Sequence, residues 1–126
     1  MRPVVYDTGV LIAADRGERR VWAEHRVRLE AGVVPLLPAP VVAQASRGPH
    51  QAQLRRLIRG CEVVAFDEVA AHRAGALLGR SQTKDVVDAS VATLAIQRAA
   101  DVISDDADDI VRLLATARPK PAIFDV

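Results

Sequence analysis

The feature that most constrains the fold is a short apolar strand that ends in an acid near the start of the chain. Val4–Tyr6 has the pattern of a buried strand, Asp7 ends it, and Thr8 and Gly9 lead into the apolar run 10–14, which fits a helix. A strand followed directly by a helix is typical of α/β folds, in which ligands bind beyond the carboxyl ends of the strands. Asp7 is therefore either part of such a ligand site or simply the N-cap of the helix.

Strand and helix patterns alternate along the rest of the chain. Helical spacing of apolar residues, Pro near helix starts and Gly after helix ends set the boundaries. Gly79 is expected to end one helix, with a polar loop at 80–84. The order predicts an α/β protein, one domain over residues 1–126, with helices packed on a small, mainly parallel twisted sheet. We expect further strands at 33–37, 62–66, 101–104 and 122–125, and helices at 18–31, 38–48, 51–59, 68–78, 86–100 and 107–117.

Composition excludes several classes of protein. Half of the 126 residues are hydrophobic, which indicates a globular core and not a disordered chain. No apolar run approaches the length of a membrane span, and Asp7 interrupts the N-terminal apolar run, unlike a signal peptide. The single cysteine, Cys61, cannot form an internal disulfide. We therefore expect a cytoplasmic protein without a membrane partner, in which Cys61 is a small buried apolar residue.

The net charge of +1 hides an asymmetry along the chain. Between residues 85 and 109 aspartates dominate, and Arg98 is the only basic residue. A basic strip together with an acidic cluster suits a polyanionic partner and a divalent cation. An ordinary solvated helix face is the alternative for the arginines of the strip. Residues 31–61 contain no acid and carry the arginines of this basic strip, which are Arg47, Arg55, Arg56 and Arg59.

Acidic residues stand where three expected elements meet one end of the sheet. Asp7 ends the first strand, Asp88 lies one turn into the helix that begins near Asp85, and Asp105 and Asp106 follow a later strand. Carboxylates brought together in this way repel one another unless a cation lies between them. Oxygen ligands select Mg²⁺ or Mn²⁺, and such an ion orients water and offsets charge on a phosphoryl group. The pattern therefore indicates a metal-dependent nuclease.

Each acid also has a simpler structural interpretation. Asp85 and Asp88 have the spacing of an N-cap and the third helical residue, with Thr83 as an alternative cap. Asp106 and Asp109 repeat that spacing at the next helix. It is the joint placement of the acids that favours a metal site over a set of separate helix starts.

Three blocks of the sequence resemble the PIN-domain ribonucleases, in particular the VapC-type toxins of bacterial toxin–antitoxin pairs. The blocks are 4–12 (VVYDTGVLI), 85–95 (DVVDASVATLA) and 102–110 (VISDDADDI). The resemblance covers essentially the whole chain and implies the PIN-like three-layer α/β/α fold. It implies a Mg²⁺- or Mn²⁺-dependent endoribonuclease that cleaves structured RNA, often tRNA or rRNA. It also implies a VapB-type antitoxin as partner and a homodimer.

Carried over position by position, the resemblance assigns metal binding and catalysis to three acids. Asp7 matches the first metal-binding acid, and Asp88 matches the acid that precedes Ala in a later block. Asp106 matches the last acid; Asp105 stands where Ser is usual, and replaces Asp106 if the alignment shifts by one residue. Thr8 fits a small hydroxyl residue that supports the site.

The sequence departs from the family pattern at two further positions. Gly9 replaces the more usual Ser, and Gln44 stands where the resemblance implies Glu, on the helix after 38–40. The carbonyl oxygen of Gln44 can still bind a metal or its water, but the side chain brings no charge. We expect weaker metal affinity and one tightly held ion, with loss of activity as a second outcome. Asp85 is a candidate to restore the missing charge.

The basic strip has three interpretations. Arg47 and the arginines at 55, 56 and 59 are candidates for contacts with RNA phosphates, and such binding would weaken with salt. The same residues are alternatively structural, or they face the antitoxin. An antitoxin tail can also bring an arginine of its own into an acidic pocket, which is a favourable charge-assisted contact.

Other functions compete with that of a toxin. A PIN nuclease used for RNA maturation would share every feature described so far. A catalytically weakened PIN-fold binding module would explain Gln44. A signalling receiver domain also gathers acids at strand ends, but it needs a buried lysine beside them. The only lysines, Lys84 and Lys120, lie in an expected loop and near the C-terminus, which disfavours that alternative.

Overall fold

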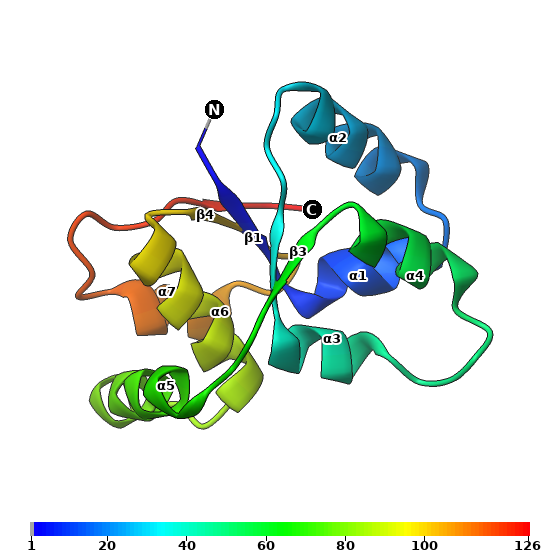
Figure 1. The fold of residues 1–126 in the computed structure, drawn as a ribbon. Coiled ribbons are helices and arrows are strands. Elements are labelled where there is room, and N and C mark those ends of the chain that lie inside the picture. The colour runs from blue at the N-terminus through cyan, green and yellow to red at the C-terminus, as the bar shows by residue number, and fades with distance from the viewer. Residues whose placement is uncertain (1) are drawn as a thin grey trace.

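The computed structural model describes residues 2–126 of the chain. Within them lie five strands and seven helices, and Figure 1 shows them in chain order. The strands are β1 (Val4–Tyr6), β2 (Leu36–Pro38), β3 (Glu62–Val64), β4 (Asp101–Ile103) and β5 (Ile123–Phe124). The helices are α1 (Thr8–Asp15), α2 (Arg19–Glu30), α3 (Ala39–Ala45), α4 (Ala52–Arg59), α5 (Glu68–Ser81), α6 (Val86–Arg98) and α7 (Asp108–Leu114).

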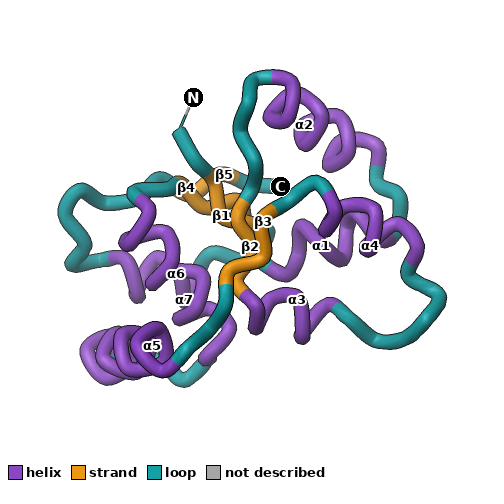
Figure 2. Tube along the Cα trace, in the orientation of Figure 1, coloured by secondary structure: helices purple, strands orange, loops and turns teal. Residues whose placement is uncertain are grey.

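The strands form one parallel sheet in the order β3-β2-β1-β4-β5. This sheet runs through the middle of the molecule (Figure 2). The chain adds β2 and β3 on one side of β1 and then crosses to the other side at β4. The order therefore reverses between β1 and β4. In open α/β sheets such a switch point forms a crevice at the carboxyl ends of the strands, where ligands bind.

Helices pack around this sheet and give the three-layer α/β/α fold that the sequence predicts. In Figure 1, α5, α6 and α7 lie on one side of the strands and α1, α2 and α4 on the other. Helix α6 packs directly on β1, β2 and β4, and both α5 and α7 pack on α6. The stretch from Ala89 to Ala95 is buried all round the helix axis, which is typical of a core helix. Helix α6 is thus the central support of its layer.

Several element boundaries differ from the prediction, among them those of α5, β2 and α7. Helix α5 continues through Gly79 and ends at Ser81, and its C-cap residue, Gln82, has a positive φ of 57°. A glycine weakens a helix by only about 1 kcal/mol, and packing of α5 on α6 outweighs that cost. Strand β2 begins at Leu36, after Pro35, whose ring removes the backbone donor that an earlier start would need. Helix α7 ends at Leu114 instead of Ala117.

The core is aliphatic, as the composition predicts. Leu11, Leu37, Leu57 and Ile110 are among the largest fully buried side chains. Cys61 packs against this core, and burial raises the pKa of its thiol to about 12, so it remains a neutral, apolar group. Among the described residues, no helix combines the length and the apolar character needed to cross a membrane.

Candidate active site

The site is organised by the pairing of β1 with β4. Tyr6 pairs with Ile103 in register, so the residues that follow, Asp7 and Ser104, emerge side by side at the carboxyl ends of the two central strands. The backbone N–H of Asp7 still donates to the carbonyl of Ile103 at 3.0 Å, which continues the ladder one step beyond β1. The switch point of the sheet therefore presents one carboxylate and one hydroxyl from strands that are far apart in sequence.

Asp7 is a buried carboxylate, only 5% exposed. One of its oxygens accepts a 2.7 Å hydrogen bond from the backbone N–H of Thr8, and the other accepts a 2.8 Å bond from the hydroxyl of Ser104. Asp7 is also the N-cap residue of α1, so the capping interpretation of this residue is correct. The two bonds fix both carboxylate oxygens toward the end of the sheet.

Ser104 joins Asp7 to the last acidic block. Its Oγ donates to Asp7 and accepts a 3.1 Å hydrogen bond from the backbone N–H of Asp106. Asp106 is therefore not the N-cap of α7, whose N-cap residue is Ala107 and has no side-chain bond; that structural interpretation of Asp106 is wrong. Ser104 is not among the site residues predicted from the sequence. Its position after the strand was visible, but the pairing of its strand with β1 was not.

The third element of the site is the N-terminus of α6. Asp85 is its N-cap, and the carboxylate accepts a 2.9 Å hydrogen bond from the backbone N–H of Asp88, as the spacing predicts. Thr83, the alternative cap, instead lies within 2.9 Å of the Ser81 hydroxyl. The first turn of α6 thus carries two carboxylates, and the one at Asp88 is partly buried.

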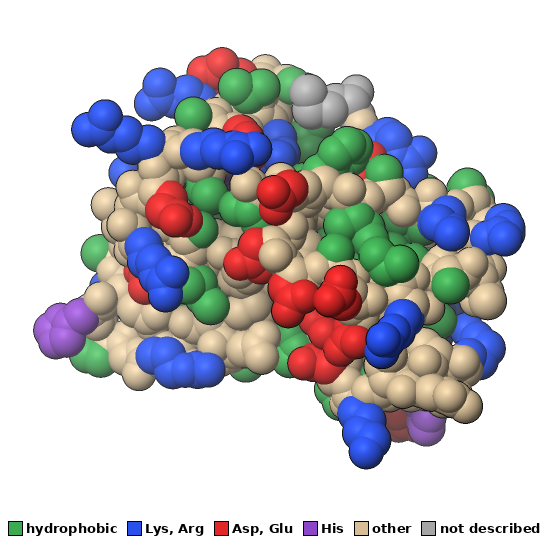
Figure 3. Space-filling view, turned by 180° about the vertical axis from the view of Figure 1, so that it is seen from behind, with side chains coloured by type: hydrophobic (Ala, Val, Ile, Leu, Met, Phe, Trp, Pro, Cys, Tyr) green, Lys and Arg blue, Asp and Glu red, His purple; other side chains and the backbone are tan. Residues whose placement is uncertain are grey.

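The carboxylates of these elements act on one another. Burial raises the pKa of Asp88 to about 7, and the negative charges of Asp85, Asp7, Asp109 and Asp106 add to the shift. This result brings Asp109, which sequence analysis treated only as a helix-start residue, into the acid cluster. Figure 3 shows a patch of acidic side chains on the face of the molecule opposite to that of Figure 1.

Asp7 is more deeply buried than Asp88, and neighbouring carboxylates repel its charge as well. Burial raises the pKa of Asp7, hydrogen bonds from Ser104 and Thr8 oppose that shift, and the charges of Asp105 and Asp85 reinforce it. A group that is costly to ionise in the isolated protein becomes favourable to ionise when a cation is beside it. The electrostatics of the cluster therefore favour the binding of a cation.

The donor set fits a cation that keeps part of its water shell. Within residues 2–126, no three His, Cys, Asp or Glu side chains stand close enough to enclose an ion together. Mg²⁺ does not need such a cage, because it commonly binds through one or two carboxylates, retained waters and substrate phosphates. Asp7, Asp88 and Asp106 offer only hard oxygen ligands, which suit Mg²⁺ or Mn²⁺.

Gln44 lies next to Thr8 at the edge of the site. The hydroxyl of Thr8 donates a 2.6 Å hydrogen bond to the side-chain carbonyl of Gln44. Thr8 therefore supports the first turn of α1 through α3, as a supporting hydroxyl would. The same bond uses a lone pair of the oxygen that sequence analysis considered as a metal ligand, and the side chain itself is neutral.

Asp105 and Gly9 are in direct contact. The carboxylate of Asp105 lies over the first turn of α1, where a β-carbon at position 9 would overlap it. Asp105 itself is exposed to solvent. Gly9 and Asp105 both stand where the resemblance implies Ser, and the two residues are in contact in the structure.

The arginines of the basic strip lie away from this cluster. Figure 1 places α4 beside α1, on the side opposite to α6 and α7. Arg47 precedes α4 and donates to the carbonyls of Ala43 and Ser46. Arg55 and Arg59 are exposed on α4. No arginine is among the charges that shift the pKa of the acids at positions 7 and 88.

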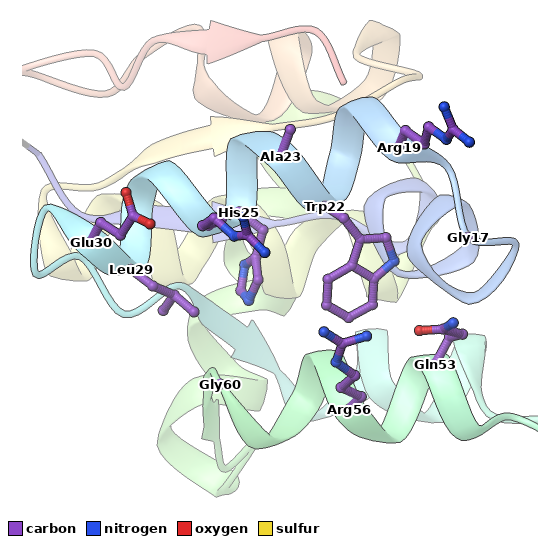
Figure 4. A pocket seen from close by; sticks show the side chains of 11 residues that line it. Gly17, Arg19, Trp22, Ala23, His25, Leu29, Glu30, Gln53, Arg56 and Gly60 are labelled. Atoms are coloured by element: carbon purple, nitrogen blue, oxygen red, sulfur yellow. The ribbon is translucent and has the colours of Figure 1, made fainter.

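Arg56 instead lines a groove between α2 and α4. Its guanidinium carbon lies 4.8 Å from the centre of the Trp22 ring, a cation–π arrangement that Figure 4 shows from close by. The groove has a volume of about 530 Å³, and Arg19, Arg26 and the buried His25 also line it. Trp22 is thus an anchor between helices, and its indole N–H donates to the carbonyl of Ala14.

Fold and site together define an α/β domain with an acid cluster at the switch point of a parallel sheet. The chain matches the family model of the PIN domain over residues 4–114, and it belongs to that family. A comparison with curated protein sequences found no match.

Several solved structures share the fold. VapBC2 from Rickettsia felis, solved with a DNA fragment from its promoter, gives a TM-score of 0.75 at 14% identity, with 98% of each chain covered. FitAcB from Neisseria gonorrhoeae gives 0.68 at 18% identity, with 96% of each chain covered. A toxin–antitoxin complex from Klebsiella pneumoniae gives 0.65 at 21% identity, over 84% of this chain and 88% of that one. At these identities the likeness establishes the fold.

Proposed function

We propose that this PIN domain is a metal-dependent endoribonuclease that acts as the toxin of a type II toxin–antitoxin pair. The observation that carries the proposal is the hydrogen-bonded link from Asp7 through Ser104 to the backbone of Asp106. The carboxylates of Asp7 and Asp106 are also close enough to Asp88 to raise its pKa. Such a preorganised set of carboxylates at the end of a parallel sheet suits phosphodiester hydrolysis, in which positioning and charge compensation supply most of the catalysis.

The roles of the residues follow from their surroundings. Asp7, whose two oxygens are already oriented by Thr8 and Ser104, would hold the ion, with Asp106 and Asp88 as further ligands or as acceptors for its waters. A bound Mg²⁺ or Mn²⁺ supplies an activated water and offsets the negative charge that develops on the phosphate. Asp88 has a pKa of about 7 in the metal-free protein, and a cation beside it would favour its ionised form.

The partners of the proposed toxin follow from the same comparisons and from the surface. VapBC2 and the Klebsiella complex are toxin–antitoxin proteins, so we propose a VapB-type antitoxin as the partner of this chain and structured RNA, such as tRNA or rRNA, as its substrate. The groove between α2 and α4, with its three arginines and Trp22, suits an acidic segment of that antitoxin. The homodimer implied by the resemblance stays a prediction.

Cleavage of total RNA by antitoxin-free protein tests the enzyme. Wild-type protein with Mg²⁺ or Mn²⁺ should give discrete fragments, and EDTA or Asp7→Asn should abolish them. Asp108→Asn is a matched control, because Asp108 is an exposed acid of the same region and is not among the charges that act on Asp88. Full cleavage by Asp7→Asn, or cleavage that persists in EDTA, would contradict the proposal.

A second candidate is a PIN-fold binding module without turnover. One observation favours it: the neutral Gln44, where the resemblance implies a carboxylate, is engaged by Thr8. In this case the protein would bind RNA in the presence of metal, yet release no fragments at any metal concentration. Conversion of such a silent protein into a nuclease by Gln44→Glu would establish this alternative.

A further inference from the structure

The acid cluster contains a carboxylate that the family pattern does not require. Asp105 stands where the resemblance implies Ser, and its side chain lies over the first turn of α1 against Gly9. In the described part of the chain, this carboxylate accepts no hydrogen bond and pairs with no Arg, Lys or His. No basic side chain of the described residues therefore offsets its charge.

The location of Asp105 depends on the absence of a side chain at position 9. A β-carbon built on Gly9 would overlap the carboxyl carbon and both oxygens of Asp105. With Ser at position 9, as in the family pattern, the Asp105 side chain would have to move away from α1. Gly9 and Asp105 are thus sterically coupled, so a change at one determines where the other can lie.

The same region has a neutral residue, Gln44, where the resemblance implies the negative charge of Glu. Gln44 is neutral, and its carbonyl oxygen already accepts the hydroxyl proton of Thr8. Thr8 directly precedes Gly9, so the Gln44 bond and the Asp105 contact both involve the first turn of α1, beside Asp7. The charge of Asp105 acts on Asp7, because the two carboxylates are close enough to repel each other.

We propose that Asp105 supplies the carboxylate that Gln44 lacks, and that Gly9 makes room for it. The divalent-cation site would then hold as many negative charges as the family pattern implies, with one of them contributed by the β4–α7 loop in place of α3. This inference rests on the proposed metal centre and concerns only which residues complete it.

Mn²⁺ binding to the whole protein tests the inference without any need for RNA cleavage. Free Mn²⁺ measured by electron paramagnetic resonance gives the dissociation constant for each variant. We expect Asp105→Asn to weaken binding about tenfold, since one charge a few ångströms from a divalent ion is lost. Asp108→Asn, which removes a neighbouring exposed acid, should bind as the wild type does.

Two further variants test the coupling. Gln44→Glu in the Asp105→Asn background should return Mn²⁺ affinity to about the wild-type value, because it restores the charge at the alternative position. Gly9→Ala should weaken binding as much as Asp105→Asn does, and the Gly9→Ala/Asp105→Asn double variant should be no weaker. If Gly9→Ala fails to fold, the Asp105→Asn and Gln44→Glu pair still decides the question.

The outcomes separate this inference from the proposed function. If Asp7→Asn abolishes Mn²⁺ binding while Asp105→Asn binds like the wild type, the metal centre stands and the role of Asp105 is overturned. If Asp105→Asn lowers only the melting temperature, its carboxylate serves the N-terminus of α1 and the inference fails. If the wild-type protein does not bind Mn²⁺, both proposals fall together.

Discussion

The hydroxyl of Ser104 bonds to the carboxylate of Asp7 across the two central strands of the sheet, at 2.8 Å. The residues are separated by almost the whole length of the domain, yet register between β1 and β4 brings them together. Because Ser104 also holds the backbone N–H of Asp106, it is a positioning residue for two of the acids at once.

Removal of that hydroxyl should therefore affect both stability and activity. Ser104→Ala leaves a buried carboxylate oxygen without its donor, which should lower the free energy of unfolding by roughly 1–3 kcal/mol. RNA cleavage should fall, and Ser104→Thr, which keeps the hydroxyl, should recover most of both losses. Urea unfolding and initial cleavage rates measure the two effects; a Ser104→Ala protein with wild-type values in both would contradict the positioning role.

The metal-free protein should be less stable at pH 8 than at pH 5 on account of Asp88. Its pKa is raised from 3.8 to about 7 in the folded state, so between these values the folded protein binds more protons than the unfolded chain. Stability is therefore lost as pH rises through this window. Asp88→Asn should stabilise the metal-free protein at pH 8 by roughly 1–3 kcal/mol, and Mg²⁺ should stabilise the wild type more than this variant.

Thermal unfolding in EDTA and in Mg²⁺ at the two pH values measures this effect. Asp108→Asn again serves as the control and should follow the wild-type curve. An Asp88→Asn protein that is less stable than the wild type at pH 8 would show that Asp88 has a structural role that outweighs the repulsion.

His25 should give the opposite pH dependence. Its ring is buried, with Nδ1 2.9 Å from the Tyr6 hydroxyl and the edge of Trp22 beside it. Burial lowers the pKa of His25 below 6.5, and the positive charge of Arg28 adds to the shift. The unfolded chain then binds the proton first, so stability should fall as pH drops below about 6.5.

Urea unfolding between pH 5 and pH 7 tests this prediction. The free energy of unfolding of His25→Gln, relative to that of the wild type, should rise as the pH falls from 7 to 5. His72→Gln is the matched control, because His72 is exposed on α5 and contacts only Glu68 within the described structure. Equal acid sensitivity in the wild type and His25→Gln would assign the transition to other groups.

Charge reversal on α4 should separate the two candidate roles of the basic strip. Arg55→Glu/Arg59→Glu leaves the Arg56–Trp22 contact in place. Because α4 lies beyond α1 from the acid cluster, RNA cleavage should change by no more than about twofold at physiological salt. Binding of a VapB-type antitoxin, the proposed partner, should weaken, as measured by titration calorimetry. Loss of cleavage with an intact fold would assign this face to RNA.

Patterns among residues that are close in sequence were sufficient to predict much of the fold and part of the candidate site. An acid after an apolar strand located Asp7, and N-cap spacing located Asp85 and the first turn of α6, because both signals lie within a few residues of sequence. The alternation of strands and helices predicted the layered parallel sheet, since parallel neighbours need helical crossovers.

The rest depends on contacts between distant parts of the chain. Ser104 matters only because its strand pairs with β1, and Asp105 only because it meets Gly9. The prediction that Asp106 is the N-cap of α7 was wrong, because the backbone N–H of Asp106 donates to the hydroxyl of Ser104 and α7 begins after Ala107. The predicted end of α5 at Gly79 was wrong because packing of α5 on α6 outweighs the low helix propensity of glycine. None of these partners is a neighbour in sequence.

The pairing of β1 with β4 also governs when the acid cluster can exist during synthesis. A ribosome delivers β1 and Asp7 first, but the neighbouring strand β4, followed by Ser104, is made only after β2, β3 and the helices α1 to α6. Contacts of such wide sequence separation form slowly and late. A nascent chain that ends before β4 therefore carries no assembled cluster, so the proposed nuclease would remain inert on the ribosome until nearly all of the domain has emerged.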